Sequence, residues 1–278
     1  MECGRSGACR MRTGKRTVGE PNDGNRDGRG ERHHRDSESA TRLRDDVSRA
    51  LKDGSLPTHS PPLPYRWVGW WPVRLLRSIL VVCCYHPFLR IWVRRLVVEG
   101  REHIPPGPVI YAAEHTSMAD TPLILWAVGT RRNRLVVTAA RDFFFRSNRP
   151  GFGPFVALVF GAIPIDRTGS PRQSLYDAIT WLRSDFSVVI YPQGMIPGHA
   201  ADETRLHRGV ALLAKQTHCP VVPVRIVGAS EFLPAGIHWP RRATVRITFL
   251  GPILLADKEN AKCFTDRLSK ELFSVTTE

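Results

Sequence analysis

Long apolar runs are scarce in this sequence. A membrane-spanning helix needs roughly 20 consecutive, mostly apolar residues. The best candidate covers residues 78–89 and is bounded by Arg77 and Arg90. That stretch is too short to span, so we expect a protein that lies on a membrane or enters it shallowly. The first residues, MECGRSGACRMRTGKR, have no apolar stretch after their basic residues, and we therefore expect no secretory signal peptide.

Several motifs of catalytic and cofactor-binding proteins are also missing. The six cysteines form no C-x-x-C pair, which disfavours a zinc site and a secreted disulfide framework. There is no G-x-S-x-G nucleophile motif, no P-loop, and no G-x-G-x-x-G after a strand. Three histidines near each other in sequence, His199, His207 and His218, do not have the spacing of metal ligands. We therefore expect no metal and no prosthetic group.

Acidic residues are outnumbered by basic ones. The chain has 40 Lys and Arg against 26 Asp and Glu, a net charge of +14 and a pI of about 10.2. An anionic partner is expected, and nucleic acid, anionic lipid and phosphorylated small molecules all qualify. Most of the basic residues are arginine, and no helix-turn-helix or zinc module is visible, so nucleic acid is the disfavoured partner.

The N-terminal part has the composition of a tail. Residues 1–55 are rich in Gly, Arg, Asp and Ser and almost without aromatic residues, which is typical of disorder. A Pro-rich stretch at 55–64 is typical of a stiff linker. We therefore assign residues 1–64 to a disordered tail and a linker.

Residues 65–98 differ sharply from this tail. They contain four tryptophans, six arginines and no acidic residue. Tryptophan favours the membrane interface, and long arginine side chains can reach phosphate headgroups. We expect a helical segment that lies in the interface of an anionic membrane. The alternative is a helix packed against the rest of the protein with its arginines in water.

Residues 99–278 show the pattern of an α/β domain. Short apolar runs bounded by turn residues predict strands at 97–100, 108–114, 134–140, 161–166, 187–192, 221–228 and 243–250. Helices are predicted at 121–128, 171–184 and 206–217, the first with a Pro at its second position. This alternation favours an α/β sandwich whose mixed, largely parallel sheet is flanked by helices.

The clearest chemical feature follows the strand predicted at 108–114. His115 and Asp120 are five residues apart, across a turn that leads into a helix. The carboxylate can accept the proton of one ring nitrogen and leave the other nitrogen free to act as a general base. Ser117 lies within the turn but is not expected to act as a nucleophile. The spacing is common, so a structural Asp and an incidental His remain the alternative.

The order of further motifs resembles the glycerolphosphate acyltransferase family. His115 and Asp120 match its His-x-x-x-x-Asp motif, and Arg141 precedes an aromatic cluster as in that family. The remaining matches are Gly151-Phe152-Gly153, the Gly-x-x-x-Ile-Asp-Arg segment ending at Arg167, Tyr191-Pro192-Gln193-Gly194-Met195, and Val222-Pro223-Val224. Two positions differ from the family, which usually has Glu and Thr where this chain has Gln193 and Met195.

The resemblance implies roles for these residues. His115 would be the general base and Asp120 its orienting partner in a direct acyl transfer. Arg167 would bind an acceptor phosphate, although pairing with Asp166 at the surface is the alternative. Arg141 is either a headgroup contact or part of a solvated face. Gln193 and Gly194 would contact the substrate, with Gly194 allowing a close backbone approach unless it is an ordinary turn glycine.

The resemblance also implies an activity and its partners. The chain is expected to be an acyltransferase of phospholipid biosynthesis that moves a fatty acyl group to a lysolipid acceptor, lysophosphatidic acid by default. Acyl-CoA and acyl carrier protein are both possible thioester donors. We expect a peripheral or monotopic protein on the cytoplasmic face of the membrane. The difference at Gln193 leaves open a non-catalytic lipid-binding relative of the same fold.

Overall fold

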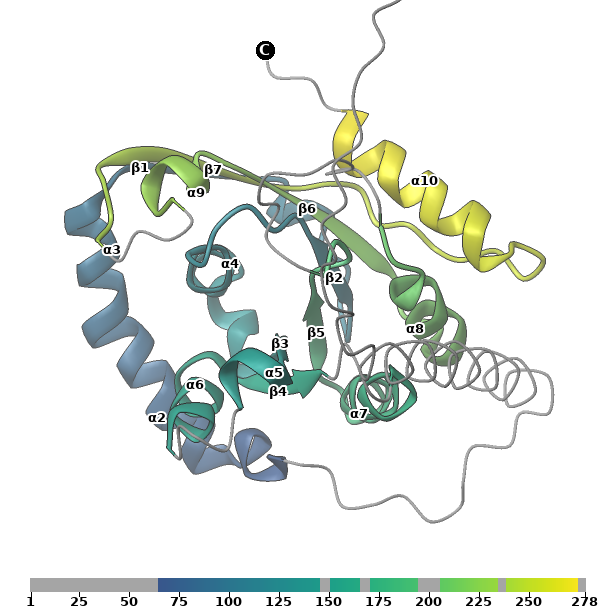
Figure 1. Cartoon of the computed structure of the whole chain (residues 1–278), viewed down its shortest axis with the longest axis horizontal. Coiled ribbons are helices and arrows are strands. Elements are labelled where there is room, and N and C mark those ends of the chain that lie inside the picture. The colour runs from purple at the N-terminus through teal and green to yellow at the C-terminus, as the bar shows by residue number, and fades with distance from the viewer. Residues whose placement is uncertain (1–64, 146–150, 166–170, 195–205, 235–238, 275–278) are drawn as a thin grey trace, which may run out of the picture. The chain divides into compact units, whose positions relative to one another are not determined.

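A computed structural model describes most of the chain after the tail. The described residues are 65–145, 151–165, 171–194, 206–234 and 239–274. The tail and linker predicted for residues 1–64 lie outside them, as does Arg167. What the structure describes is an α/β domain with a helical segment in front of it, as the sequence predicted (Figure 1).

The strands of the described residues form one sheet. They are β1 (Val93–Glu99), β2 (Ile110–Ala113), β3 (Leu135–Ala140), β4 (Ala162–Ile165), β5 (Ser187–Ile190), β6 (Val221–Val227) and β7 (Ala243–Phe249). Their order across the sheet is β1-β7-β6-β2-β5-β3-β4. Neighbouring strands are parallel except for β6 and β7, which are antiparallel. The predicted mixed, largely parallel sheet is therefore confirmed, and each predicted strand is present.

Helices connect the strands. They are α2 (Trp71–Leu80), α3 (His86–Trp92), α4 (Asp120–Ala127), α5 (Arg141–Phe144), α6 (Phe152–Phe160), α7 (Pro171–Arg183), α8 (Gly209–Thr217), α9 (Ala229–Phe232) and α10 (Ala261–Ser274). The helices predicted at 121–128, 171–184 and 206–217 correspond to α4, α7 and α8. The sequence interpretation did not include α6 or α10.

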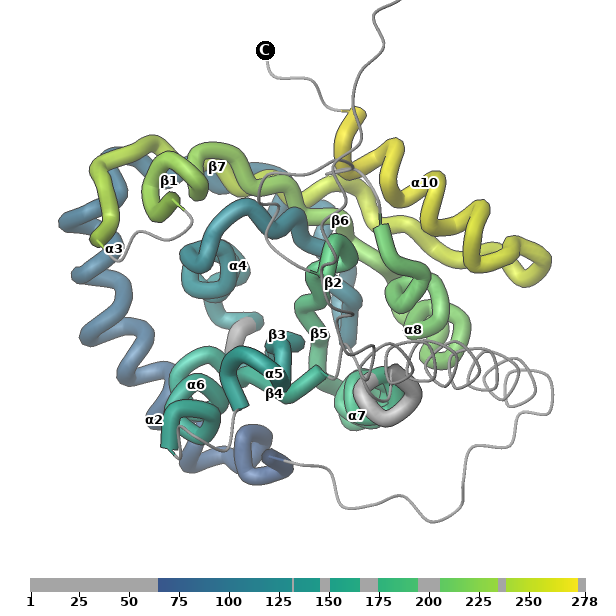
Figure 2. The backbone as a smooth tube through the Cα atoms, in the orientation of Figure 1, coloured from purple at the N-terminus to yellow at the C-terminus, as the bar shows by residue number. Residues whose placement is uncertain are grey.

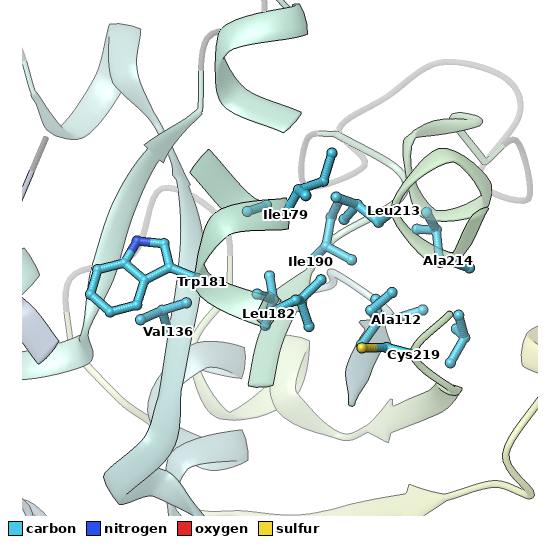
Figure 3. Close-up of a cluster of buried hydrophobic side chains, with 14 of the residues drawn as sticks. Ala112, Val136, Ile179, Trp181, Leu182, Ile190, Leu213, Ala214 and Cys219 are labelled. Atoms are coloured by element: carbon cyan, nitrogen blue, oxygen red, sulfur yellow. The ribbon is translucent and has the colours of Figure 1, made fainter. Parts of the chain in front are cut away.

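The central strands are buried on both faces because helices cover the sheet on both sides. Side chains alternate along a strand, so β2 sends Ile110 and Ala112 into one core and Tyr111 and Ala113 into the other. This burial explains why its sequence is continuously apolar rather than alternating. Figure 3 shows part of the first core, where Ala112 lies near Ile190 of the neighbouring strand β5.

The two faces carry different helices. Leu182 of α7, Leu213 of α8 and Phe264 of α10 pack in the first core. The second core contains Leu123 of α4 and Leu89 of α3, together with residues of α9. In the ribbon and in the tube, α7, α8 and α10 lie on one side of the sheet and α4 lies on the other (Figures 1 and 2). The result is a sandwich of helices, sheet and helices.

The N-terminal helical layer, which we define as Trp71–Trp92, is one continuous helix. It consists of α2, a π-helical turn η2 (Val81–Tyr85) and α3. The π turn lies just before Pro87, which has no N–H and would clash with a carbonyl in a regular helix. With 22 residues, this helix is long and apolar enough to cross a membrane by length and composition alone. The prediction that no segment reaches that length is therefore wrong.

The end of this layer also differs from the prediction. The helix stops at Trp92, and β1 begins at Val93, although the helical segment was expected to continue to residue 98. Residues 93–98 pair with β7 in parallel and form an edge of the sheet. Their Val and Leu residues favour a strand. The helical layer is thus joined directly to the sheet, without a linker between them.

Arg77 explains why the apolar segment appeared too short in the sequence. Its side chain is folded inward and is only 3% exposed. The guanidinium donates hydrogen bonds to the carbonyls of Leu158 (2.8 Å), Val68 (3.1 Å) and Ala157 (3.4 Å). Burial and the nearby Arg74 lower the pKa of Arg77 to about 10, so the group stays charged at neutral pH. Two of these carbonyls end α6, where the helix dipole favours a cation.

Gly161 makes room for this contact. It follows α6 with a φ of +68°, a left-handed conformation that favours glycine. A Cβ at this position would lie 2.9 Å from Arg77 Nη1 and 3.0 Å from the Leu135 carbonyl oxygen. The family-like glycine at the start of the Gly-x-x-x-Ile-Asp-Arg segment is therefore required by packing between the helical layer and the sheet.

Candidate active site

The predicted site residues gather at one edge of the sheet. Strands β2, β3, β4, β5 and β6 point the same way, so their carboxyl ends meet at that edge. His115 follows β2, Arg141 follows β3, and Gln193 follows β5. Ligands of α/β proteins commonly bind outside the carboxyl ends of parallel strands. The sheet topology therefore brings together motifs that are far apart in the sequence.

His115 and Asp120 are in direct contact. The imidazole Nδ1 lies 2.8 Å from Asp120 Oδ2. A tight turn after β2 connects the two residues, and Asp120 is the first residue of α4. The turn is closed by a hydrogen bond from the Asp120 N–H to the Ser117 carbonyl (3.1 Å). The five-residue spacing thus places an imidazole against a carboxylate.

The same carboxylate oxygen also holds the turn itself. Asp120 Oδ2 accepts the backbone N–H groups of Thr116 (2.7 Å) and Ser117 (2.8 Å) as well as the imidazole. The Asp120 side chain is fully buried. A carboxylate oxygen only accepts hydrogen bonds, so His115 Nδ1 must carry the proton. This arrangement leaves the lone pair on the other ring nitrogen, Nε2.

The geometry leaves Nε2 of His115 available as a base. Among the described residues, none forms a hydrogen bond to it, and 18% of the His115 side chain is exposed. A base in this position can take a proton from a bound hydroxyl, and the buried carboxylate then stabilises the resulting imidazolium. The pair has the orienting geometry of a catalytic triad without a serine.

A protein nucleophile is not provided by the nearest serine. Ser117 is fully buried, and its hydroxyl donates to the Leu233 carbonyl at 2.7 Å. The same hydroxyl oxygen accepts the Ala119 N–H at 3.1 Å. Ser117 therefore stabilises the turn and is not free to act as a nucleophile.

Tyr191 covers one face of the imidazole. The two ring centroids are 4.1 Å apart and the planes differ by 22°, which is a stacked arrangement. The Tyr191 hydroxyl lies 2.7 Å from the hydroxyl of Thr121, the residue that follows Asp120. Burial, the main cause, and the charge of Asp120 raise the pKa of Tyr191 well above its usual range. The phenol is therefore protonated throughout the physiological pH range.

Gln193 contacts the backbone of the motif. Its Oε1 accepts the His115 N–H at 2.7 Å. A glutamate at this position could accept the same hydrogen bond, which explains how the chain keeps the local structure without the family carboxylate. What glutamine removes is a negative charge beside the imidazole.

Gly194 forms the turn after Gln193. Its φ of +77° requires the left-handed conformation, and a Cβ would lie 3.2 Å from the His207 ring. The Gly194 N–H donates to the Tyr191 carbonyl at 3.0 Å. That N–H is therefore already engaged within the turn. Donors from residues 195 onward belong to a segment outside the described part of the chain.

The structure gives less support to the two predicted arginines, Arg141 and Arg167, as site residues. Arg141 is exposed at the start of α5, and β3, the strand before it, is separated from β2 by β5. Arg167 and Met195 lie outside the described residues, although β4 ends at Ile165, shortly before Arg167. Arg141 forms no hydrogen bond or ion pair with His115 among the described residues. The assignment of both arginines to the acceptor remains a prediction.

Sequence reasoning missed two members of this site. Tyr191 was noted only as part of a family-like segment, and Thr121 only as the start of a predicted helix. The signal for Thr121 was its position directly after Asp120, in the first turn of α4. The signal for Tyr191 was its position at the end of β5, the strand that pairs with β2.

The site is thus a His-Asp pair at the carboxyl edge of a largely parallel sheet, with Asp120 buried and His115 partly exposed. Residues 95–227 match the family model described as Acyltransferase. The family resemblance seen in the sequence is therefore confirmed over this region, which covers slightly less than half of the chain. The matched region includes each of the predicted site residues.

A solved structure supports the same fold. The chain is similar to the 1-acyl-sn-glycerophosphate (LPA) acyltransferase PlsC from Thermotoga maritima, with a TM-score of 0.50 and 19% identity. The match covers 72% of this chain and 75% of that one. No curated protein sequence matches the chain significantly. The predicted fold class is thus confirmed.

Proposed function

We propose that this chain transfers a fatty acyl group from a thioester to the hydroxyl of a lysophospholipid, with lysophosphatidic acid as the default acceptor. The observation that carries the proposal is the hydrogen bond between His115 Nδ1 and the buried Asp120 carboxylate (2.8 Å). It presents Nε2 as a base, and the nearest serine hydroxyl is engaged elsewhere. The activity named for PlsC, on 1-acyl-sn-glycerophosphate, is consistent with this choice.

The reaction proceeds by direct transfer. His115 Nε2 takes the proton of the acceptor hydroxyl as its oxygen attacks the thioester carbonyl carbon. The tetrahedral intermediate collapses, the carbon–sulfur bond breaks, and the departing thiolate takes the proton from Nε2. The Asp120 carboxylate stabilises the imidazolium between these two proton transfers. The products are an ester and a free thiol, and the base is regenerated without an acyl-enzyme.

The acceptor is assigned by charge and position. A guanidinium binds phosphate oxygens two at a time, so we assign Arg167 to the acceptor phosphate and Arg141 to a headgroup contact. Both follow strands whose carboxyl ends lie at the site edge. Gln193 and Gly194 would contact the substrate beside the imidazole. The donor is acyl-CoA or acyl carrier protein, and no cofactor is assigned.

The helical layer provides a surface for the lipid substrates. Large apolar side chains are exposed along it or just before it. They are Trp70, Trp71, Leu75, Leu76, Ile79, Val82, Phe88 and Ile91. Phe143 of α5 and Phe155 of α6 are also exposed, and α6 packs against α2. Contiguous apolar surface of this kind is typical of membrane-binding sites.

The charges near this surface favour an anionic membrane. Four arginines in or near the helical layer are exposed: Arg66, Arg90, Arg94 and Arg95. Each basic residue close to an anionic membrane contributes about 1 kcal/mol to binding. We therefore propose that the protein associates with the cytoplasmic face of the membrane, where thioester donors are made.

The test is acyl transfer from labelled acyl-CoA to a panel of lysophospholipids presented in vesicles. His115→Ala is expected to lose about 10²–10⁴-fold in kcat, the usual contribution of a general base. The matched control is His103→Ala. His103 follows β1, which runs opposite to β2, so its imidazole lies at the other end of the sheet, where it contacts the Phe249 carbonyl.

The outcomes separate the leading function from its alternative. Transfer that is lost in His115→Ala and retained in His103→Ala supports the mechanism, and the preferred lysolipid identifies the acceptor. If the wild type transfers nothing from acyl-CoA, the assay is repeated with acyl carrier protein as donor. Vesicle binding without transfer from either donor would contradict the enzymatic proposal and support a lipid-binding relative.

A further inference from the structure

Two neighbouring residues of α4, Asp120 and Thr121, hold the imidazole of His115 in different ways. Asp120 binds Nδ1 directly at 2.8 Å. Thr121 binds the hydroxyl of Tyr191 at 2.7 Å, and the Tyr191 ring lies flat against the imidazole at 4.1 Å. The contact with Asp120 determines which ring nitrogen of His115 carries the proton. The contact with the Tyr191 ring limits rotation of the imidazole.

Stacking by the Tyr191 ring alone would not limit rotation of the imidazole. Tyr191 follows β5, and its backbone continues into the turn at Gly194, so the ring is attached to the site through one strand end. The hydrogen bond to Thr121 attaches the far end of the ring to α4. With both ends attached, the ring forms a fixed wall across one face of the imidazole.

We propose that Tyr191 and Thr121 form a positioning pair that keeps Nε2 of His115 aimed at the acceptor hydroxyl. The proposal rests on the acyltransferase function proposed above and adds two residues to it. Neither residue takes part in proton transfer: the hydroxyl of each is engaged by the other, and the phenol stays protonated. Their contribution is the angle and rigidity of the imidazole, on which proton transfer depends strongly.

The Tyr191 hydroxyl distinguishes this pair from a ring that only stacks on the imidazole. A phenylalanine would stack on the imidazole in the same way, but it would leave its far end unattached. Hydroxyls shielded from water normally find partners, and here one of the two partly buried hydroxyls donates to the other. The pair therefore adds a hydrogen bond that serves the orientation of His115 rather than substrate binding.

The groups around the imidazole are few. Among the described residues, its titratable neighbours are Asp120 of α4, Tyr191 at the end of β5, Glu114 beside it in the chain, and His207 across Gly194. Glu114 Oε2 faces the Ile226 N–H (3.4 Å). Thr121→Val replaces none of these groups and removes only the hydrogen bond between Thr121 and Tyr191, which makes that variant a clean test.

The experiment measures kcat and KM for Tyr191→Phe, Thr121→Val, the double variant and Tyr191→Leu. A net hydrogen bond is worth a factor of about 3–10, so each single variant should lose roughly that in kcat with little change in KM. The double variant should lose no more than either single one, because both remove the same bond. Tyr191→Leu, which also removes the ring, should lose about 100-fold.

A second readout does not depend on activity. In ¹⁵N spectra of histidine-labelled protein, His115 should show one tautomer, with the proton on Nδ1. Tyr191→Leu should give mixed tautomers or broadened signals, whereas Tyr111→Phe should not. Tyr111 is a matched control because it is a buried tyrosine of β2 that packs on Phe249 rather than on the imidazole.

The two readouts separate failure of the pair from failure of the function. A wild type with one tautomer that Tyr191→Leu disturbs, but with no acyl transfer, would overturn the proposed function and leave the positioning pair supported by the spectra. Additive losses in the double variant, an effect on KM alone, or an unchanged His115 spectrum in Tyr191→Leu would overturn the positioning pair. If Tyr191→Leu does not fold, the Phe and Val variants decide the question.

Discussion

The carboxyl edge of the sheet and the N-terminal helical layer distribute polar and apolar groups in opposite ways. At the edge, polar groups are buried and joined by hydrogen bonds, with three N–H groups around one oxygen of Asp120. In the layer, apolar side chains such as Leu75 and Ile79 face outward, and one charged group, Arg77, is buried. The first arrangement favours exact geometry, and the second favours contact with an apolar surface.

This difference predicts how each region responds to mutation. A change at the edge should alter catalysis with modest effects on binding to lipid. A change on the outer face of the layer should alter lipid binding with modest effects on the chemistry. A change at Arg77, which joins the layer to α6, should alter stability. Three variants test these expectations, described from the largest expected effect to the smallest.

The largest effect is expected for Asp120→Asn. Asparagine is nearly isosteric and can accept the same N–H groups, but it carries no charge to stabilise the imidazolium. Its amide NH₂ group would also take the place of Oδ1, a buried atom for which the described structure shows no hydrogen bond. We expect kcat to fall about 10³–10⁴-fold, as for the orienting carboxylate of a catalytic triad. Steady-state kinetics on vesicle substrates measures this loss.

Vesicle binding serves as the control for this variant. It should be unchanged in Asp120→Asn, because Asp120 is fully buried and far in sequence from the helical layer. Unchanged kcat would contradict the role of the carboxylate. A parallel loss of vesicle binding would show that the two regions are not independent.

The contrast between the regions also explains what could be predicted from sequence. The strands were predictable because β-branched runs such as those of β5 and β6 are bounded by turn residues. The His115–Asp120 contact was predictable because it is local: one tight turn joins the two residues.

Contacts between distant segments were not predictable in this way. Gln193 reaches the His115 N–H across 78 positions in sequence, and this contact exists only because β5 pairs with β2. Arg77 bonds to a carbonyl 81 positions away, so the sequence showed a charge at the end of an apolar run rather than a buried group. Local patterns contain no information about such pairings. Helix α6 was missed because it is apolar on nearly every side, which removes helical periodicity.

The next largest effect is expected on the outer face of the helical layer. Leu75 and Ile79 are one helical turn apart and both about half exposed. Replacing both with Glu removes apolar contact and adds two negative charges next to an anionic membrane. We expect binding to anionic vesicles to weaken about 100-fold, measured by co-sedimentation, while kcat on a short-chain soluble acceptor stays within about twofold.

Leu254→Glu is the matched control. Leu254 is also an exposed leucine, but it lies between β7 and α10, outside the helical layer. Its replacement should leave vesicle binding unchanged. Equal losses in Leu254→Glu and in the Leu75 and Ile79 variant would mean that added negative charge, rather than the face of the layer, controls binding.

The smallest effect is expected at the joint between the two regions. Arg77→Met keeps an apolar stem of similar length but leaves the carbonyls of Val68, Ala157 and Leu158 without their donor. Hydrogen bonds from a charged group contribute about 1.5–3 kcal/mol, and part of this is offset because the buried charge is removed. We expect a loss of about 2 kcal/mol in the free energy of unfolding, or about a 30-fold change in the folding equilibrium.

Thermal unfolding in detergent measures this loss, with Arg90→Met as the control. Arg90 is an exposed arginine of the same helical layer, so its replacement should leave Tm nearly unchanged. For a domain of this size, about 2 kcal/mol corresponds to a decrease in Tm of roughly 4–8 °C. At temperatures where Arg77→Met is folded, its kcat should match the wild type, because none of the hydrogen bonds that His115 and Asp120 form with the described residues involves α2. A lower kcat with unchanged Tm would instead mean that Arg77 transmits the position of the helical layer to the site.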